Sequence, residues 1–202
     1  WYDGAISIFS FLITLYFAPH LDKGIMVGVA LSMLVFLYKS MRPVVARLSM
    51  NEENVLKSAE HYRLKGCRHI SVVRFDGALF FANASYLDEQ VAKFRDEQPD
   101  LRYILLDARG INDMDASGEE ALEMLFKRVR SANLGFAMCG VKGQVLNVMN
   151  RTGLYDKIGE ENFYADSKAA VSAIVKKVHT NTDLPQKGCN DCPLTQYLPA
   201  EK

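Results

Sequence analysis

Residues 107–118, with the sequence DARGINDMDASG, decide how the rest of this chain is interpreted. They continue from residues 102–107 (RYILLD), a nearly continuous apolar run that is typical of a strand covered by helices on both faces. The last four residues, Asp115 to Gly118, then open a helix. Backbone N–H groups and the positive end of a helix dipole converge at such a loop, so it suits an anion or a phosphorylated hydroxyl.

Strands and helices are expected to alternate upstream of this loop as well. Residues 70–75 (ISVVRF) predict a strand, and the turn signal Asp76-Gly77 predicts a reversal into a second short strand at residues 79–81. A helix is expected to start at Ser85, with Asp88 three residues later as in a capping box. Its buried face would consist of Leu87, Val91 and Phe94.

The same alternation continues downstream of the loop. Strands are expected at residues 134–139 and 163–164, and helices at residues 143–152, where Gly153 would form the C-cap, and from Asp166 onward. The residues expected in the core are Ala121, Leu122, Leu125, Val129 and Ala132 of the helix after the loop, and Val171, Ile174, Val175 and Val178 of the last helix. The predicted fold class is α/β, a mixed sheet flanked by helices, because the first hairpin would be antiparallel.

Two apolar segments precede this part of the chain. Residues 4–18 (GAISIFSFLITLYFA) and 24–38 (GIMVGVALSMLVFLY) contain no charged residue, and neither shows the polar stripe of a soluble helix. Each is shorter than the roughly 20 residues that cross a bilayer, so buried core helices remain an alternative. The favoured interpretation is a transmembrane helical hairpin joined at residues 19–23, with its ends placed in the cytoplasm by Lys39, Arg42 and Arg47.

The chain is therefore divided into four parts. Residues 1–48 form the transmembrane hairpin, residues 49–66 a linker helix, residues 67–180 the α/β domain and residues 181–202 a C-terminal tail. The linker helix is predicted from helical spacing of Val55, Leu56, Ala59 and Tyr62. Because the chain starts at Trp1 instead of Met, we expect a piece of a longer membrane protein.

The loop resembles the signature loop of STAS domains, which anti-sigma-factor antagonists share with sulfate permease (SulP, SLC26-like) anion transporters. The signature-loop positions in this chain are Asp107, Arg109, Asp115, Ser117 and Gly118. Residues 75–84 (FDGALFFANA) look like the SulP branch, and so does the order of two membrane helices, basic border and STAS domain. Arg109 is a departure, since antagonist loops often carry Ser or Thr there. A guanidinium at that place would favour an acidic partner.

The resemblance implies the C-terminal part of a secondary transporter for sulfate, bicarbonate or another anion. Such a transporter would be a multi-pass homodimer in the cell (inner) membrane, in contact with the lipid bilayer. The STAS domain would lie in the cytoplasm, where it would serve dimerisation and regulation by a cytosolic protein. The substrate would bind between earlier helices, so no residue of this chain is assigned to it.

Two other functions are considered. One is a membrane-tethered signalling protein of the antagonist type, switched by phosphorylation of Ser117. The other is nucleotide binding, which no phosphate-binding glycine motif supports. The balance of 24 basic and 24 acidic residues argues against a nucleic-acid partner.

Ser117 itself has three candidate roles: an N-cap, part of a docking surface, or the phosphorylation site. Asp107 and Asp115 could be paired carboxylates, but no His or Lys accompanies them in the loop, and capping is expected instead. No G-x-S-x-G motif surrounds Ser117. We therefore expect no catalytic residues and no enzyme.

Cysteines and histidines give no pattern for a metal site. Cys189 and Cys192 form a lone C-x-x-C without the second ligand pair that zinc needs, and Cys139 is expected to be buried in a strand. The four histidines, His20, His61, His69 and His179, show no ligand spacing. No metal and no cofactor are expected.

Overall fold

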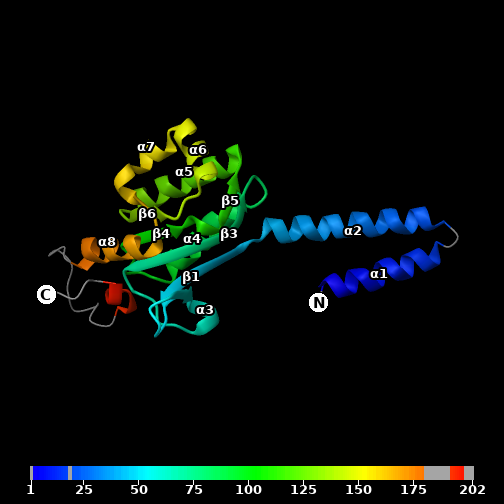
Figure 1. Ribbon diagram of the computed structural model, residues 1–202, viewed down its shortest axis with the longest axis horizontal. Helices are drawn as coiled ribbons and strands as arrows, with labels where there is room; N and C mark the ends of the chain where they lie inside the picture. Colours follow the sequence, from blue (N-terminus) through cyan, green and yellow to red (C-terminus); the bar gives the residue numbers. More distant parts are fainter. Residues whose placement is uncertain (1, 18–19, 180–191, 198–202) are drawn as a thin grey trace. The chain divides into compact units, whose positions relative to one another are not determined.

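Figure 1 shows the protein as a computed structural model, which describes residues 2–17, 20–179 and 192–197. The chain divides into two compact units, Trp1–Arg42 and Pro43–Lys202. The first unit contains the two apolar segments and the second contains the α/β part of the sequence.

The first unit is a pair of helices, α1 (Tyr2–Tyr16) and α2 (Leu21–Met41). Within the described residues, α2 is the helix that is long and apolar enough to cross a membrane, over Asp22–Met41 with a mean hydropathy of 1.7, whereas the apolar part of α1 is shorter. The helices pack through small residues: a Cβ on Gly24 would lie 2.7 Å from Cα of Thr14. The Thr14 hydroxyl donates to the Ser10 carbonyl at 2.8 Å, which satisfies it inside the helix.

The second unit is built on a mixed sheet with the strand order β2-β1-β3-β4-β6-β7 and with β5 paired to β3. Strand β1 is antiparallel to both β2 and β3, and the other pairs are parallel. The strands are β1 (Val44–Met50), β2 (Leu56–Ser58), β3 (Ile70–Leu79), β4 (Tyr103–Asp107), β5 (Ile111–Met114), β6 (Gly135–Cys139) and β7 (Phe163–Tyr164).

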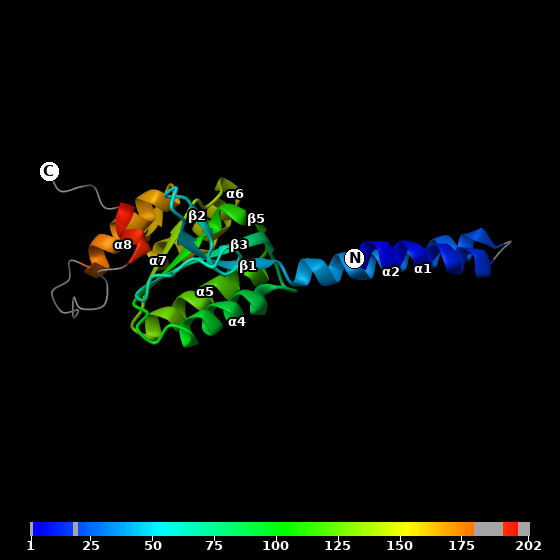
Figure 2. The same cartoon turned by 90° about the horizontal axis from the view of Figure 1, so that it is seen from below.

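Helices cover both faces of this sheet. They are α3 (Ala59–Tyr62), α4 (Ala84–Asp96), α5 (Ala116–Ser131), α6 (Gly143–Thr152), α7 (Leu154–Ile158) and α8 (Ser167–His179). Helices α4 and α5 lie together on one side (Figure 2) and share a core with α6 and α7. Helix α8 covers the other face. Neighbouring residues on β4 alternate between the two cores, Leu106 facing the first and Leu105 the second, as a strand buried on both faces requires.

The predicted core faces are largely confirmed. The side chains of α4 and α8 that were expected to be buried are buried, and so are Leu122, Leu125 and Val129 of α5. Ala132 is exposed at the end of α5, contrary to the prediction. Gly153 forms the predicted C-cap of α6 with φ 76°.

The predicted linker helix at residues 49–66 is wrong. These residues form the end of β1, all of β2 and the short helix α3. The Asn51 side chain accepts hydrogen bonds from the backbone N–H groups of Glu53 (3.1 Å) and Val55 (2.9 Å), and this turn reverses the chain into β2. Arg47, taken as part of the basic border of the membrane hairpin, lies in β1.

The predicted hairpin at residues 70–81 is also wrong, because β3 runs without reversal from Ile70 to Leu79. Gly77 has φ 156°, and the chain stays extended there while its register against β5 shifts. The sheet is mixed, as predicted, but the antiparallel partner of β3 is β1.

Two further differences concern the start of α4 and the predicted C-terminal tail. Helix α4 begins at Ala84, after Asn83, one residue before the predicted start at Ser85. Part of the predicted tail is structured, since residues Pro193–Tyr197 form a short 3-10 helix and Leu194 is buried in the second core. Cys192 is also buried in the second core, whereas residues 181–191 and 198–202, which include Cys189, lie outside the described residues.

Candidate functional site

The signature loop begins with a buried carboxylate held by an arginine two residues later. Asp107 at the end of β4 is fully buried, and both of its oxygens accept hydrogen bonds from Arg109: Nε donates to Oδ1 at 2.9 Å and the terminal nitrogen to Oδ2 at 2.6 Å. The Arg109 backbone N–H also donates to Oδ1, at 3.2 Å. The hydrogen bonding between the Asp107 and Arg109 side chains raises the pKa of Arg109. Asp107 therefore acts as the cap of the loop, as predicted.

The Arg109 side chain lies against Gly140, just after β6. A Cβ on Gly140 would lie 2.2 Å from Cγ of Arg109, and Gly140 has φ +65°. The neighbouring Cys139 is fully buried, and burial, together with the charge of Asp107, raises the pKa of its thiol to about 12. Cys139 is thus the buried strand residue that was expected, and its thiol is protonated at neutral pH.

The middle of the loop crosses closely over β3. A Cβ on Gly110 would lie 2.3 Å from the Phe75 carbonyl oxygen, so glycine is needed for this approach. The chain then forms β5, which was not predicted because only its two end residues, Ile111 and Met114, are buried and no strand pattern results.

Asp115 joins the end of the loop to the start of α5. It is the N-cap residue, and its Oδ1 accepts from the Gly118 N–H at 2.7 Å. Its Oδ2 accepts from the Phe81 N–H at 3.2 Å, and its own N–H donates to the Leu79 carbonyl at 3.2 Å. One side chain therefore fixes α5 and the segment after β3 together.

Gly118 is required by the same close packing. A Cβ there would lie 2.3 Å from the Leu79 carbonyl oxygen and 2.7 Å from its carbon. Because these atoms belong to the backbone of a central strand, moving them away would lower the stability of the fold.

Ser117 is exposed in the first turn of α5. Of the three candidate roles of Ser117, the N-cap is wrong, because Asp115, two residues earlier, takes the N-cap position. Asp115 is thus engaged as a cap, so the loop holds no pair of carboxylates arranged for acid–base chemistry. Within the described residues, no group of three or more His, Cys, Asp or Glu side chains could hold a metal ion.

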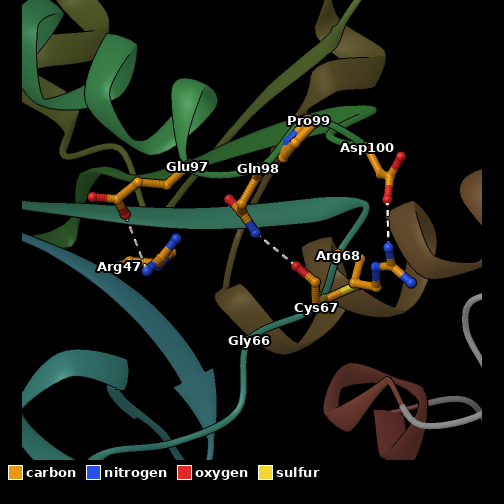
Figure 3. A pocket seen from close by; sticks show the side chains of 8 residues that line it. All are labelled: Arg47, Gly66, Cys67, Arg68, Glu97, Gln98, Pro99 and Asp100. Atoms are coloured by element: carbon orange, nitrogen blue, oxygen red, sulfur yellow. Dashed lines mark hydrogen bonds and ion pairs between the residues drawn. The ribbon is translucent and has the colours of Figure 1, made fainter.

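A separate pocket lies at the other ends of the parallel strands. Its volume is about 380 Å³, and Figure 3 shows the lining residues Arg47, Gly66, Cys67, Arg68, Glu97, Gln98, Pro99 and Asp100. Arg47 pairs with Glu97 at 3.4 Å and Arg68 with Asp100 at 2.8 Å. The charges of this lining balance, so the pocket has no positive excess that would select an anion.

Fold and loop together define a STAS domain that follows a pair of apolar helices. The STAS domain family matches residues 61–170, more than half of the chain, and the chain belongs to this family. The STAS resemblance seen in the sequence is confirmed.

The relatives are sulfate transporters. The chain is 26% identical over 188 residues to probable sulfate transporter 4.2 of Arabidopsis thaliana, covering 86% of this chain and 27% of that protein. It is 25% identical over 171 residues to sulfate transporter 3.2 of the same plant, covering 79% and 26%. The chain thus spans about a quarter of the length of these curated relatives, and its resemblance to the SulP and SLC26 branch is confirmed.

Solved structures share the fold. The inward-facing murine anion transporter Slc26a9 matches with a TM-score of 0.71 and 21% identity, covering 84% of this chain and 28% of that chain. The STAS domain of a SulP transporter from Vibrio cholerae matches with a TM-score of 0.51 and 22% identity, covering 61% and 94%.

Proposed function

We propose that this chain is the C-terminal region of a SulP-type secondary anion transporter. The observation that carries the proposal is the order of an apolar helix pair and a STAS domain, in a chain that aligns over 86% of its length with a sulfate transporter. In this proposal α1 and α2 are membrane helices of a multi-pass protein in the cell (inner) membrane. The basic residues Lys39 and Arg42, at the end of α2, support a cytoplasmic position of the STAS domain in this proposal.

The anion binds to membrane segments outside this chain. Secondary transporters hold their substrates near the bilayer midplane, between helices that belong to repeated halves. Two observations support this assignment. The pocket of the STAS domain is charge-balanced, and the basic residue of the signature loop, Arg109, is already paired with Asp107.

The STAS domain has a regulatory and dimerising role rather than an enzymatic one. Ser117 is the regulatory residue: it is exposed, and Asp115 already caps the helix on which it lies. A phosphate there would meet the positive end of the α5 dipole, which tolerates negative charge. A cytosolic regulatory protein would therefore contact the surface around Ser117, and a second copy of the transporter would complete a homodimer.

Uptake by whole cells tests the proposal. The complete protein is produced in cells that lack their own sulfate uptake, and entry of radiolabelled sulfate, chloride and bicarbonate is measured. The proposal predicts uptake of at least one of these anions. Normal insertion into the membrane without uptake of any of them would contradict it.

The alternative is a membrane-tethered signalling protein switched at Ser117, and the exposure of that hydroxyl is the observation in its favour. The two functions are separated by Ser117→Asp and Ser117→Ala in the complete protein. A transporter regulated at this site changes its uptake rate with Ser117→Asp and keeps it with Ser117→Ala. A signalling protein shows no uptake with either residue and changes its binding to a soluble partner.

A further inference from the structure

Strand β3 extends beyond the point where the chain enters the second unit. The first residue of β1, Val44, lies opposite Asp76, and β3 continues for three residues to Leu79. At about 3.3 Å per residue, β3 ends roughly 10 Å past Val44, on the side from which the chain arrives.

An aromatic side chain is presented at this end. Phe81 follows β3 and is 74% exposed, and Val44 is 64% exposed. Among the large apolar side chains described in this unit they are the most exposed, and the next, Val55, Tyr62 and Met124, are 45% to 53% exposed. The Phe81 backbone is fixed by its hydrogen bond to Asp115, and its ring meets the Phe80 ring edge-on at 5.6 Å between centroids. The signature loop thus fixes the backbone of a residue whose ring is exposed.

The start of β1 is joined to the end of α2 by a short connection. Only Arg42 and Pro43 separate Met41, the last residue of α2, from Val44. A chain of this length spans at most about 11 Å. If α2 crosses a bilayer, as the proposed function requires, β1 starts close to the surface of that bilayer.

We infer that Phe81, together with Val44, contacts the interfacial region of the lipid bilayer. Tryptophan and tyrosine are enriched at this depth, and phenylalanine is among the apolar residues that interfacial segments bury there. The inference rests on the proposed function, because it needs α2 in the membrane. The contact is mainly apolar, since charges at this end of the sheet are paired with each other, Arg74 with Asp76 and Arg109 with Asp107.

Fluorescence quenching in vesicles tests this inference. Trp1 is the only tryptophan of the chain, so Trp1→Phe gives a silent background for single reporters in the full 202-residue chain. Phe81→Trp is the reporter and Tyr62→Trp the matched control, because Tyr62 is an exposed aromatic of the same unit that follows β2, at the far end of β1. Each variant is reconstituted into phosphatidylcholine vesicles, with or without acyl chains brominated near the headgroup.

Bromination should lower the emission of the Phe81→Trp variant about twofold and leave that of Tyr62→Trp almost unchanged. A third reporter, Phe36→Trp, lies within α2 and shows whether that helix is in the bilayer. Quenching of Phe36→Trp, with Phe81→Trp no more quenched than Tyr62→Trp, would overturn this inference and leave the proposed function standing; Phe81 would then be a site for a protein partner. Absence of quenching for Phe36→Trp would overturn both.

Discussion

The Asp115 carboxylate holds the backbone of Phe81, a residue 34 positions earlier in the chain, through a hydrogen bond of 3.2 Å. Its second oxygen accepts from the Gly118 N–H at 2.7 Å. Through these two hydrogen bonds, the signature loop connects the end of β3 to the start of α5. This arrangement explains why the loop needs an acid at one place and a glycine at another, independently of any ligand.

Asp115→Ala should destabilise the protein more than Ser117→Ala does. The first change removes an N-cap and leaves two backbone N–H groups without their acceptor, at a cost of about 1–2 kcal/mol. The second removes an exposed hydroxyl that does not cap the helix and should cost less than about 0.5 kcal/mol. Urea unfolding of the three proteins measures both differences. An equal or larger loss for Ser117→Ala would mean that the serine is the cap after all.

Gly118→Ala should be strongly destabilising. Its Cβ would lie 2.3 Å from the Leu79 carbonyl oxygen, and such overpacking costs at least about 2 kcal/mol. Gly143→Ala is the matched control, because that glycine also lies in the first turn of a helix and a Cβ there meets nothing within 4 Å. Thermal unfolding should show a lower midpoint for the first variant and an unchanged or slightly higher midpoint for the control. Similar midpoints for the two variants would disprove the close approach.

Arg109→Ala should leave the buried Asp107 carboxylate without its side-chain partner. Because Arg109 is 46% exposed and water can reach this pair, the expected loss is moderate, about 2 kcal/mol. Adding Asp107→Asn removes the unpaired charge and should recover part of the loss. Denaturant unfolding of the single and double variants checks this coupling. A double variant that is less stable than Arg109→Ala would show that the loss does not come from an unpaired charge on Asp107.

Cys139 should make stability fall at high pH. Its pKa is raised in the folded protein from 9.0 to about 12, so its contribution to stability is complete below pH 9 and is lost as the pH rises from 9 to 12. The Cys139→Ala variant lacks this term, and its unfolding free energy should fall less over the same range. At pH 8 the thiol of Cys139 should also resist alkylation until the protein unfolds. Rapid alkylation of Cys139 in the native protein would contradict its burial.

Much of the fold could be predicted because its core elements are buried on regular faces. The run that contains Leu105 and Leu106 has no polar interruption, and the spacing of Leu122, Leu125 and Val129 matches one face of a helix. The prediction of a linker helix at residues 49–66 was wrong for a physical reason. The spacing of Val55, Leu56, Ala59 and Tyr62 fits a helix, but the Asn51 side chain stabilises a turn locally, and the tertiary pairing of β1 with β3 decides the outcome.

The loop residues could be predicted, but their individual roles could not. Asp115 and Ser117 are both good N-cap residues, and only the backbone geometry selects the first. In strand β5 only the two end residues are buried, and apolar and polar residues do not alternate, so no sequence pattern predicts the strand. The exposure of Phe81 depends on where β3 ends against the loop, which a linear sequence does not contain.

Transport by the purified complete protein decides whether this chain belongs to an anion transporter. The protein is reconstituted into vesicles loaded with unlabelled sulfate, and the entry of labelled sulfate is followed, with Gly118→Ala as the variant whose STAS domain is disrupted. We predict accumulation of label with the unaltered protein and a markedly lower initial rate with the variant. No accumulation by correctly folded protein with sulfate, chloride or bicarbonate would contradict the account.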